Sequence, residues 1–430
     1  MGHGHVARVV MGLSAALALA VLAAHPEVRR LERRFGITVL LSSGLPFLLI
    51  GAIFRQRAVG ILTPEILGDL RPAFEFGLGW IGFVVGMSFD VRKLDRMPRS
   101  LGGVIALESI VPMATTAAAC SIALVLLGVP WRNAGFARDA LVFAACAAPS
   151  APIAIEAFGH VVGERRARMV GAITDVDEVT ALVALGIVAI LFRPTVENVL
   201  WVLPSSAWFL VTLGLGGVLG IVTYVLLRGA KTATEELALL LGAVALCAGM
   251  AEHLALSVPV VCAIAGALLA NLPLSDEIGV RKILVEVERP LYLVFLVVVG
   301  ASWNPWAWQG WAVAPVFVFA RVAGKWLGAR LARRVGSDEL PDAADLALAL
   351  MPQSPISIVV IVAAATLYAH TGHADRIGWG INAVIIGGIL TELVVRALQR
   401  LSGRARLPTE APEPVPVPLP ARTHSSGEEP

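Results

Sequence analysis

Charge is scarce in this 430-residue chain, in which only 15% of the residues are Asp, Glu, Lys or Arg. Soluble globular proteins carry about 25% charged residues. Hydrophobic residues make up 57% of the chain, and its mean hydropathy is +0.78. The composition therefore excludes an ordinary soluble protein and predicts a polytopic membrane protein.

Cysteine is also scarce, and the four cysteines suggest no chemistry. Cys120, Cys146, Cys247 and Cys262 all fall inside apolar segments, without metal-ligand spacing and without the pattern of a disulfide framework. The sequence shows no nucleophile–base pair, no zinc ligand set and no phosphate-binding loop. We therefore predict that the protein is not an enzyme, uses no cofactor and has no nucleic-acid partner.

Long apolar runs are abundant, and their lengths suit a bilayer, because a spanning helix needs about 20 apolar residues. Their number predicts an all-α polytopic membrane protein with about thirteen transmembrane helices. The predicted spans cover approximately residues 6–24, 36–54, 73–89, 102–127, 139–158, 168–192, 200–228, 235–254, 257–272, 289–303, 308–329, 344–369 and 378–398.

The loops between these spans alternate in their content of Lys and Arg. Every second loop is rich, beginning with the one that holds Arg29, Arg30, Arg33 and Arg34. Loops rich in Lys and Arg stay on the cytoplasmic side. We therefore expect the N-terminus outside and the C-terminus in the cytoplasm, in a bacterial inner membrane.

The last part of the chain, residues 401–430, is rich in proline and polar residues and has no helical period. Such a composition is typical of disordered or polyproline-like segments. We therefore divide the chain into a transmembrane domain at 1–400 and a disordered cytoplasmic tail at 401–430.

Two distant spans share the motif P-x-x-P-I-x-I, at Pro149 and Pro152 and again at Pro352 and Pro355. The matching spans lie an odd number of spans apart, so they cross the bilayer in opposite directions, which predicts an inverted repeat. Each proline pair interrupts helical hydrogen bonds. Interrupted backbone is tolerated at membrane depth where protein buries it or where it lines a watery cavity. Two matched, broken and crossing helices favour a transporter's binding site over a pair of ordinary kinks.

Three acidic residues, Asp175, Asp177 and Glu178, lie inside the apolar segment 168–192. A charged side chain at the bilayer centre costs roughly 2.5–3.5 kcal/mol on insertion scales. Asp175 and Glu178 share a helix face, whereas Asp177 points away from Asp175. The pattern favours a buried site for a monovalent metal cation or a proton. The alternative is a helix near the membrane edge whose acids are solvated.

A few other polar residues are placed to support this site. Glu108 and Arg321 occupy nearly equivalent positions in the two repeats. Arg321 can neutralise an acid of the 168–192 span or Glu108, or it can serve as a structural bridge between helices. Ser150 and Thr174 offer the oxygen donors that hard monovalent cations prefer. Lys325 lies nearer the cytoplasmic end of its predicted span, where its side chain can extend to the interface.

Three sequence segments, occurring in the same order as in a known family, give the chain a family resemblance over most of residues 30–400. They lie at 76–92, 251–273 and 288–300. Each string is weak alone, but their shared order and spacing resemble the monovalent cation:proton antiporter-2 family. The resemblance implies the sodium/proton antiporter fold.

The same resemblance implies roles for individual residues. The family's ion-binding pair is Asp-Asp followed by Val, and here Asp177, Glu178 and Val179 occupy that place. Glu178 would then carry the cation and the proton, with Asp177 beside it. Electrogenic members carry a lysine in the tenth span that pairs with the acid. Residues 290–303 contain none, so the coupling stoichiometry is left open, with Arg321 as a candidate substitute.

Together these features predict a secondary antiporter that exchanges Na⁺ or K⁺ for H⁺ by alternating access, with the carboxylates Asp177 and Glu178 as the shared site. A core of spans over residues 73–192 and 289–369 would move against a scaffold that builds a homodimer within membrane lipid. Two alternatives stay open. One is a Na⁺-coupled organic-anion transporter, for which only Arg321 and Lys325 could bind the substrate, and the other is an ion channel or a non-transporting sensor.

Overall fold

The computed structural model describes residues 45–56, 62–95, 97–98, 100–151, 164–194, 203–273, 277–336, 340–369, 371 and 374–401, together with residue 14. Within these residues the chain forms helices and no strand longer than a single bridge. The helices are α4 (Leu45–Arg55), α5 (Pro64–Asp69), α6 (Arg71–Ser88), α7 (Val91–Asp95), α8 (Ser100–Leu126), α9 (Ala134–Ala147), α11 (Glu164–Leu191), α12 (Ser205–Leu227), α13 (Ala233–His253), α14 (Val258–Asn271), α15 (Glu277–Ser302), α16 (Trp308–Val335), α17 (Ala343–Leu350), α18 (Ile356–Leu367) and α19 (Ala374–Leu401).

Five of these helices are long and apolar enough to cross a membrane. They are α8, α12, α13, α16 and the part of α19 from Arg376 to Val395, and three shorter apolar helices accompany them. Apolar side chains on α12, such as Leu210 and Val218, are more than half exposed, as expected of a lipid-facing surface. The predicted all-helical membrane architecture is confirmed. The count of thirteen spans stays a prediction, and the first predicted span and the tail at 402–430 lie outside the described residues.

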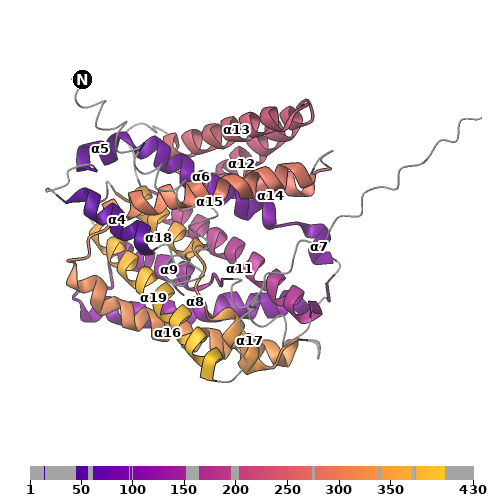
Figure 1. Ribbon diagram of the computed structural model, residues 1–430. Helices are drawn as coiled ribbons and strands as arrows, with labels where there is room; N and C mark the ends of the chain where they lie inside the picture. Colours follow the sequence, from indigo (N-terminus) through magenta and orange to yellow (C-terminus); the bar gives the residue numbers. More distant parts are fainter. Residues whose placement is uncertain are drawn as a thin grey trace, which may run out of the picture.

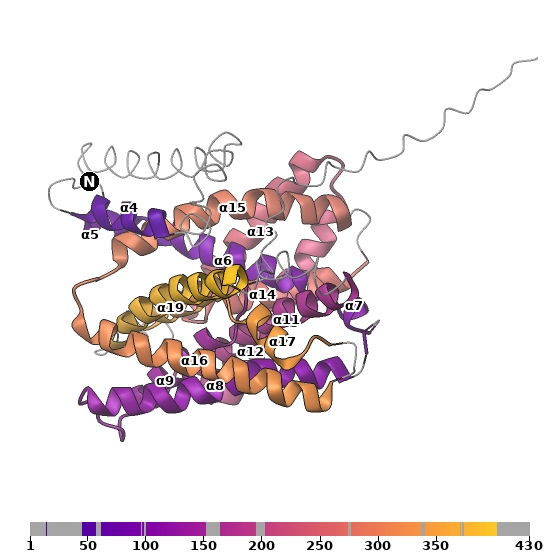
Figure 2. The same ribbon diagram turned by 60° about the horizontal axis from the view of Figure 1, so that its bottom comes forward.

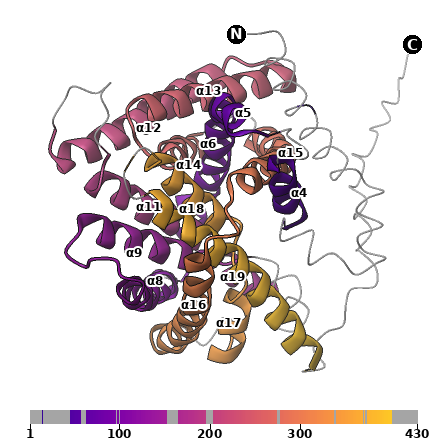
Figure 3. The same cartoon turned by 90° about the vertical axis from the view of Figure 1, so that its left-hand side faces the viewer.

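The helices form two groups (Figure 1). One group contains α4, α6, α12, α13, α14 and α15, and the other contains α8, α9, α16, α17 and α19. Figure 3 shows α11 and α18 between the two groups. We call the first group, with α5, the scaffold group, and the second, with α11 and α18, the crossing group.

Small residues let the helices within each group approach closely. Gly82 and Gly86 of α6 lie directly against the backbone of Pro259 and Ala263 in α14, where a Cβ atom would overlap the chain. In the crossing group, Gly324 of α16 lies in the same way against α8. Close approach through small residues is the usual way in which membrane helices gain packing energy. Figure 2 shows α8 and α16 running side by side along one edge of the molecule.

The boundary between the groups differs from the predicted core. The predicted core included the spans that form α6 and α15, but α6 packs mainly on α14 and α13, and α15 packs mainly on α4. The physical reason is the glycine pattern, because Gly82 and Gly86 fit α14, and Gly300 of α15 lies against the backbone of Leu48 in α4. The last helix, α19, packs instead on α16 and α18.

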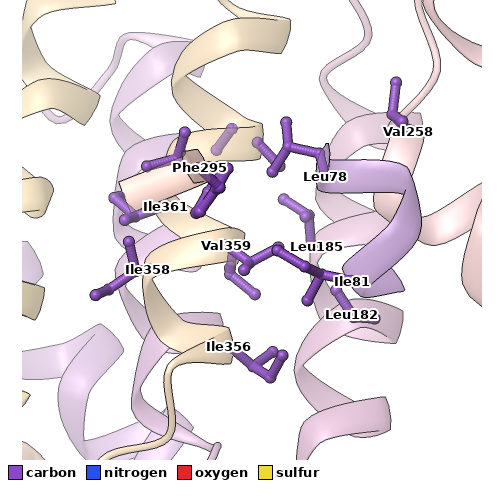
Figure 4. Close-up of a cluster of buried hydrophobic side chains, with 14 of the residues drawn as sticks. Leu78, Ile81, Leu182, Leu185, Val258, Phe295, Ile356, Ile358, Val359 and Ile361 are labelled. Atoms are coloured by element: carbon purple, nitrogen blue, oxygen red, sulfur yellow. The ribbon is translucent and has the colours of Figure 1, made fainter. Parts of the chain in front are cut away.

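The two groups meet through apolar side chains. Figure 4 shows Leu78 and Ile81 of α6 facing α11 and α18, with Leu182 of α11 and Val359 of α18 among the side chains between them. Helix α6 therefore contacts α11 and α18 through apolar side chains, which make no directional hydrogen bonds.

Helical structure stops at both proline motifs within the described residues. Helix α9 ends at Ala147, and α17 and α18 are separated by the segment 351–355. The two interruptions lie antiparallel and bond to each other: Ala151 N–H donates to the Pro352 carbonyl at 2.8 Å, and Ser354 N–H to the Pro149 carbonyl at 3.3 Å. Each break thus supplies partners for backbone groups that no water could reach at membrane depth. We call this pair of segments, 148–151 and 351–355, the crossing. Pro152 lies outside the described residues.

Candidate ion-binding site

Helix α11 carries the acidic residues past the crossing, and Asp177 is the most enclosed of them. Its side chain is fully buried. The Ser109 hydroxyl of α8 donates to Asp177 Oδ1 at 2.5 Å, and the Ser150 hydroxyl donates to Oδ2 at 3.2 Å. The carboxylate therefore receives donors from α8 and from the crossing, which satisfies the requirement that a buried charge be bonded.

Lys325 of α16 completes the surroundings of Asp177. Its Nζ donates to Asp177 Oδ2 at 2.9 Å and to the backbone carbonyl of Glu108 at 3.0 Å. Both members of this ion pair are fully buried. The expectation that Lys325 extends to the interface is wrong, because α16 continues to Val335 and so places Lys325 well inside the helix. Residues 290–303 contain no lysine, and the buried lysine that pairs with Asp177 lies on α16.

Glu178, the next residue along α11, faces the other interrupted helix. Its Oε1 accepts a hydrogen bond of 2.6 Å from the Ser354 hydroxyl. The Ser354 oxygen also accepts from the N–H of Ile356, in the first turn of α18, at 3.2 Å. The carboxylate is half-buried and lies by the N-terminus of α18, where the helix dipole favours negative charge. Two adjacent acids are thus held by different partners.

Arg321 lies one turn before Lys325 on α16 and is also fully buried. Its guanidinium donates to three carbonyls of the crossing: Met351 at 2.5 Å, Pro149 at 2.8 Å and Pro352 at 3.4 Å. Of the two roles considered for Arg321, these bonds correspond to the structural bridge. Neutralisation of Asp177 falls to Lys325 instead.

The remaining predicted residues are placed differently from one another. Glu108 of α8 is fully buried beside Lys325. The Thr174 hydroxyl donates to the Gly171 carbonyl of its own helix at 2.7 Å. Asp175 is exposed and lines a cavity of about 560 Å³ together with Asp90 and Arg168. The structure therefore brings Ser150, Asp177 and Glu108 together with Lys325. Glu178 is bonded to the other segment of the crossing, and Asp175 lies in the cavity.

The cavity beside Asp175 runs along the boundary between the two groups. Its lining comes from the end of α6, from the segment around Met97 and Pro98, and from α11 between Arg168 and Val176. It therefore reaches the turn of α11 that precedes Asp177.

Sequence reasoning missed Ser109 and misplaced Lys325. Ser109 follows Glu108 directly in a span with few polar residues, which was a usable signal. Lys325 was considered but was placed too near the end of its helix. In the part of the chain that the structure describes, no cluster of three His, Cys, Asp or Glu side chains suits a tightly held metal ion. Chemically, the site offers two adjacent carboxylates and several hydroxyl oxygens, one carboxylate being already paired with an ammonium group.

Comparison with known proteins agrees with this architecture. The family model described as "Sodium/hydrogen exchanger, transmembrane" matches residues 16–398. A search of curated proteins finds no match. Among solved structures, the chain is similar to the sodium proton antiporter MjNhaP1 from Methanocaldococcus jannaschii, with 17% identity and a TM-score of 0.66 over 90% of this chain and 98% of that one. The chain therefore belongs to the sodium/hydrogen exchanger family, and it is an integral, multi-pass membrane protein of the cation:proton antiporter class.

Proposed function

We propose that the protein exchanges Na⁺ or K⁺ for H⁺ and that Asp177 and Glu178 form the shared site. One observation carries the proposal: a fully buried aspartate paired with a fully buried lysine, next to a glutamate held at the crossing. Ionisable groups inside membrane helices are costly and commonly mark ion pathways and proton relays. The family membership supports cation:proton antiport, and the residue pair supplies the place for it.

Exchange follows from competition for the same carboxylates. With no cation bound, Lys325 satisfies Asp177, and a proton on Glu178 keeps that carboxyl neutral. A cation that enters between the two acids takes the place of the Lys325 ammonium at Asp177 Oδ2 and requires Glu178 to be ionised. The hydroxyls of Ser109, Ser150 and Ser354 turn their oxygens to the cation. Binding of the cation and binding of the proton thus exclude each other, which is the basis of obligatory exchange.

Access to the site fits a cycle in which one group moves against the other. The cavity beside Asp175 would admit ions from the side on which Met97 and Pro98 lie, which the charge pattern assigns to the cytoplasm. The crossing group would then shift along the apolar contact of Figure 4 to expose the acids to the other side. In this proposal α6 and α15 belong to the scaffold group, and the mobile core comprises α8, α9, α11 and α16–α19.

The scaffold group would also build the homodimer. Helix α12 presents a largely exposed apolar face that includes Leu210, Leu213 and Val225. We place the N-terminus outside and the C-terminus in the cytoplasm, in a bacterial inner membrane, because every second loop is rich in Lys and Arg.

Of the alternative functions, the organic-anion transporter is disfavoured by the bonds of its two candidate residues. Arg321 and Lys325 both donate to oxygens of the protein itself. An anion would have to displace those partners. A channel would move ions without linked protons, so coupling is the property to measure.

Purified protein in liposomes with an imposed pH gradient tests the proposal. Addition of Na⁺ or K⁺ outside should dissipate the gradient in the wild type and reveal which cation is preferred. The double variant Asp177→Asn, Glu178→Gln should lose this response. A matched control, Asp69→Asn with Glu286→Gln, removes two carboxylates elsewhere on the surface and should retain the response. Undiminished exchange in the first double variant would rule out the proposed site.

A further inference from the structure

A second, smaller cavity lies between the scaffold group and α18. It has a volume of about 60 Å³. The scaffold group lines it with the polar side chains of Arg71, Glu75, Glu252 and Ser257, and the last turns of α18 line the other side. A cavity of this size has room for a small ion together with water. None of these polar side chains takes part in the exchange proposed for the acids of α11.

This cavity and the one beside Asp175 lie at opposite ends of α6. Ser88 lines the cavity beside Asp175, and it lies about 20 Å along the helix from Glu75, since an α-helix rises about 1.5 Å per residue. In the proposed orientation the smaller cavity therefore faces the outside, and we call it the outer cavity. Leu78, which faces α18 in Figure 4, also lines it. The outer cavity thus borders the contact along which the two groups would shift.

Two carboxyl groups of the outer cavity share one arginine. Arg71 Nε lies 2.9 Å from Glu252 Oε1 and 3.8 Å from Glu75 Oε1. The Glu252 side chain is 31% exposed and that of Glu75 only 6%, so Glu252 lies at the mouth of the cavity and Glu75 deeper inside. Arg193, which follows α11, donates instead to the Leu254 carbonyl at 2.8 Å. A monovalent cation would therefore balance the second carboxylate.

Ser257 offers a hydroxyl oxygen to the same cavity. It occupies the N-cap position of α14, where a serine side chain commonly accepts a bond from a helix N–H group, but here it makes no such bond. Its Oγ is buried and has no hydrogen-bond partner among the described residues, and the residue is only 4% exposed. A buried hydroxyl without a partner is unfavourable. This oxygen therefore marks a position at which a ligand can bind.

We propose that the outer cavity binds a monovalent cation through the carboxylates of Glu75 and Glu252 and the hydroxyl of Ser257. Carboxylate and hydroxyl oxygens are the donors that hard cations prefer. The inference rests on the proposed exchange, for which the outer cavity collects the cation on the outer face. A shift of α18 away from Leu78 then opens the way from the outer cavity to the acids of α11.

The outer cavity sets the apparent affinity for the cation at the outer face. Negative charge in a cleft raises the local concentration of cations by roughly tenfold to a thousandfold. Asp90 and Asp175 line the cavity at the other end of α6. Each face of the protein therefore has its own acids at the entrance, and a change in one pair should be felt on one face alone.

Exchange measured from each face separately tests the inference. Membrane vesicles from cells that make the full-length protein are prepared right-side-out or everted, so that added Na⁺ or K⁺ meets one face. Glu75→Gln should raise the half-saturating cation concentration at the outer face by about tenfold and leave the inner face unchanged. Glu65→Gln, the same change at an exposed residue of α5, should alter neither face. Equal changes at both faces, or no change for Glu75→Gln, would overturn the inference.

Ser257→Ala guards against a Glu75 variant that fails to fold, and it leaves the pair of Arg71 with Glu252 intact. If the hydroxyl binds the cation, its removal should raise the half-saturating concentration at the outer face by about threefold or more. A hydroxyl that is merely unpaired would behave differently. Its removal would leave that concentration unchanged and raise the melting temperature, and this result would overturn the inference.

Direct binding separates this inference from the proposed function. The purified double variant Asp177→Asn, Glu178→Gln lacks the exchange site but should still bind a radioactive Na⁺ or Rb⁺ tracer, and adding Glu75→Gln should abolish that binding. If the double variant binds no tracer, only the outer cavity is overturned. If wild-type vesicles show no exchange, the proposed function is wrong, and tracer binding still decides whether the outer cavity holds a cation.

Discussion

Removing the charge of Lys325 gives the sharpest test of the site. In Lys325→Met the side chain keeps a similar volume, but Asp177 loses a partner 2.9 Å away in a place where both groups are fully buried. At an effective dielectric constant of 20, two unit charges at this separation attract by about 6 kcal/mol. Because desolvation offsets part of this attraction, loss of one partner of a buried pair costs about 3–5 kcal/mol.

Equilibrium unfolding of the purified protein in mixed lipid–detergent micelles measures this cost. We expect Lys325→Met to be destabilised by about 3–5 kcal/mol and the double variant Lys325→Met, Asp177→Asn to recover at least about 1.5 kcal/mol of it, since residues in contact couple by that order. Lys282→Met, which removes a surface pair 3.9 Å long, should change stability by less than about 1 kcal/mol. A single variant as stable as the wild type, or a double variant without recovery, would refute the assignment of the pair.

Four further changes have defined outcomes. Arg321→Ala removes the hydrogen-bond donors to the carbonyls of the crossing, so the free energy of unfolding should fall by about 1.5–3 kcal/mol per bond lost. Protease should also cleave the 351–355 segment faster, and unchanged cleavage would contradict the role of Arg321 as a structural bridge. Ser354→Ala removes the bond to Glu178, and the half-saturating cation concentration in the liposome assay should change by about tenfold, with Ser357→Ala as the control that must not reproduce it. Gly86→Leu places a side chain against α14 and should abolish the folded protein in size-exclusion chromatography, whereas Gly217→Ala, at an open position, should not. Asp175→Asn alters an exposed charge, so apparent cation affinity should fall at low ionic strength and recover in salt; equal effects at both would argue for direct ligation.

The broken helices and the acids could be predicted from sequence because each violates a strong local rule. Proline pairs inside apolar spans interrupt helical bonding, and Asp177 with Glu178 carries charge where charge is expensive. Such violations are visible without knowledge of the fold. Within the described residues the two interruptions pair with each other, and Asp177 and Glu178 each accept a hydrogen bond from a serine of the crossing. That the two acids form an ion site stays a prediction.

The partners of these residues could not be predicted in the same way. Lys325 obeys the ordinary pattern of a basic residue toward one end of an apolar run, and only the full length of α16 shows that it is enclosed. The division into two groups depends on which glycine faces meet, as at Gly82 and Gly324, and those contacts join residues far apart in the chain. Neither the enclosure of Lys325 nor the division into two groups can be predicted from composition and motif spacing.

The main-chain hydrogen bonds between the two interrupted segments have a consequence for the leakage of ions. The main-chain N–H groups of Ala151 and Ser354 donate hydrogen bonds between the two segments of the crossing. Arg321 of α16 donates hydrogen bonds to carbonyls of both segments. Opening a water-filled passage through the crossing would break several of these buried hydrogen bonds at once. If the proposed exchange is correct, the crossing would therefore also hinder ion leakage, and it would do so through backbone atoms that most substitutions leave untouched.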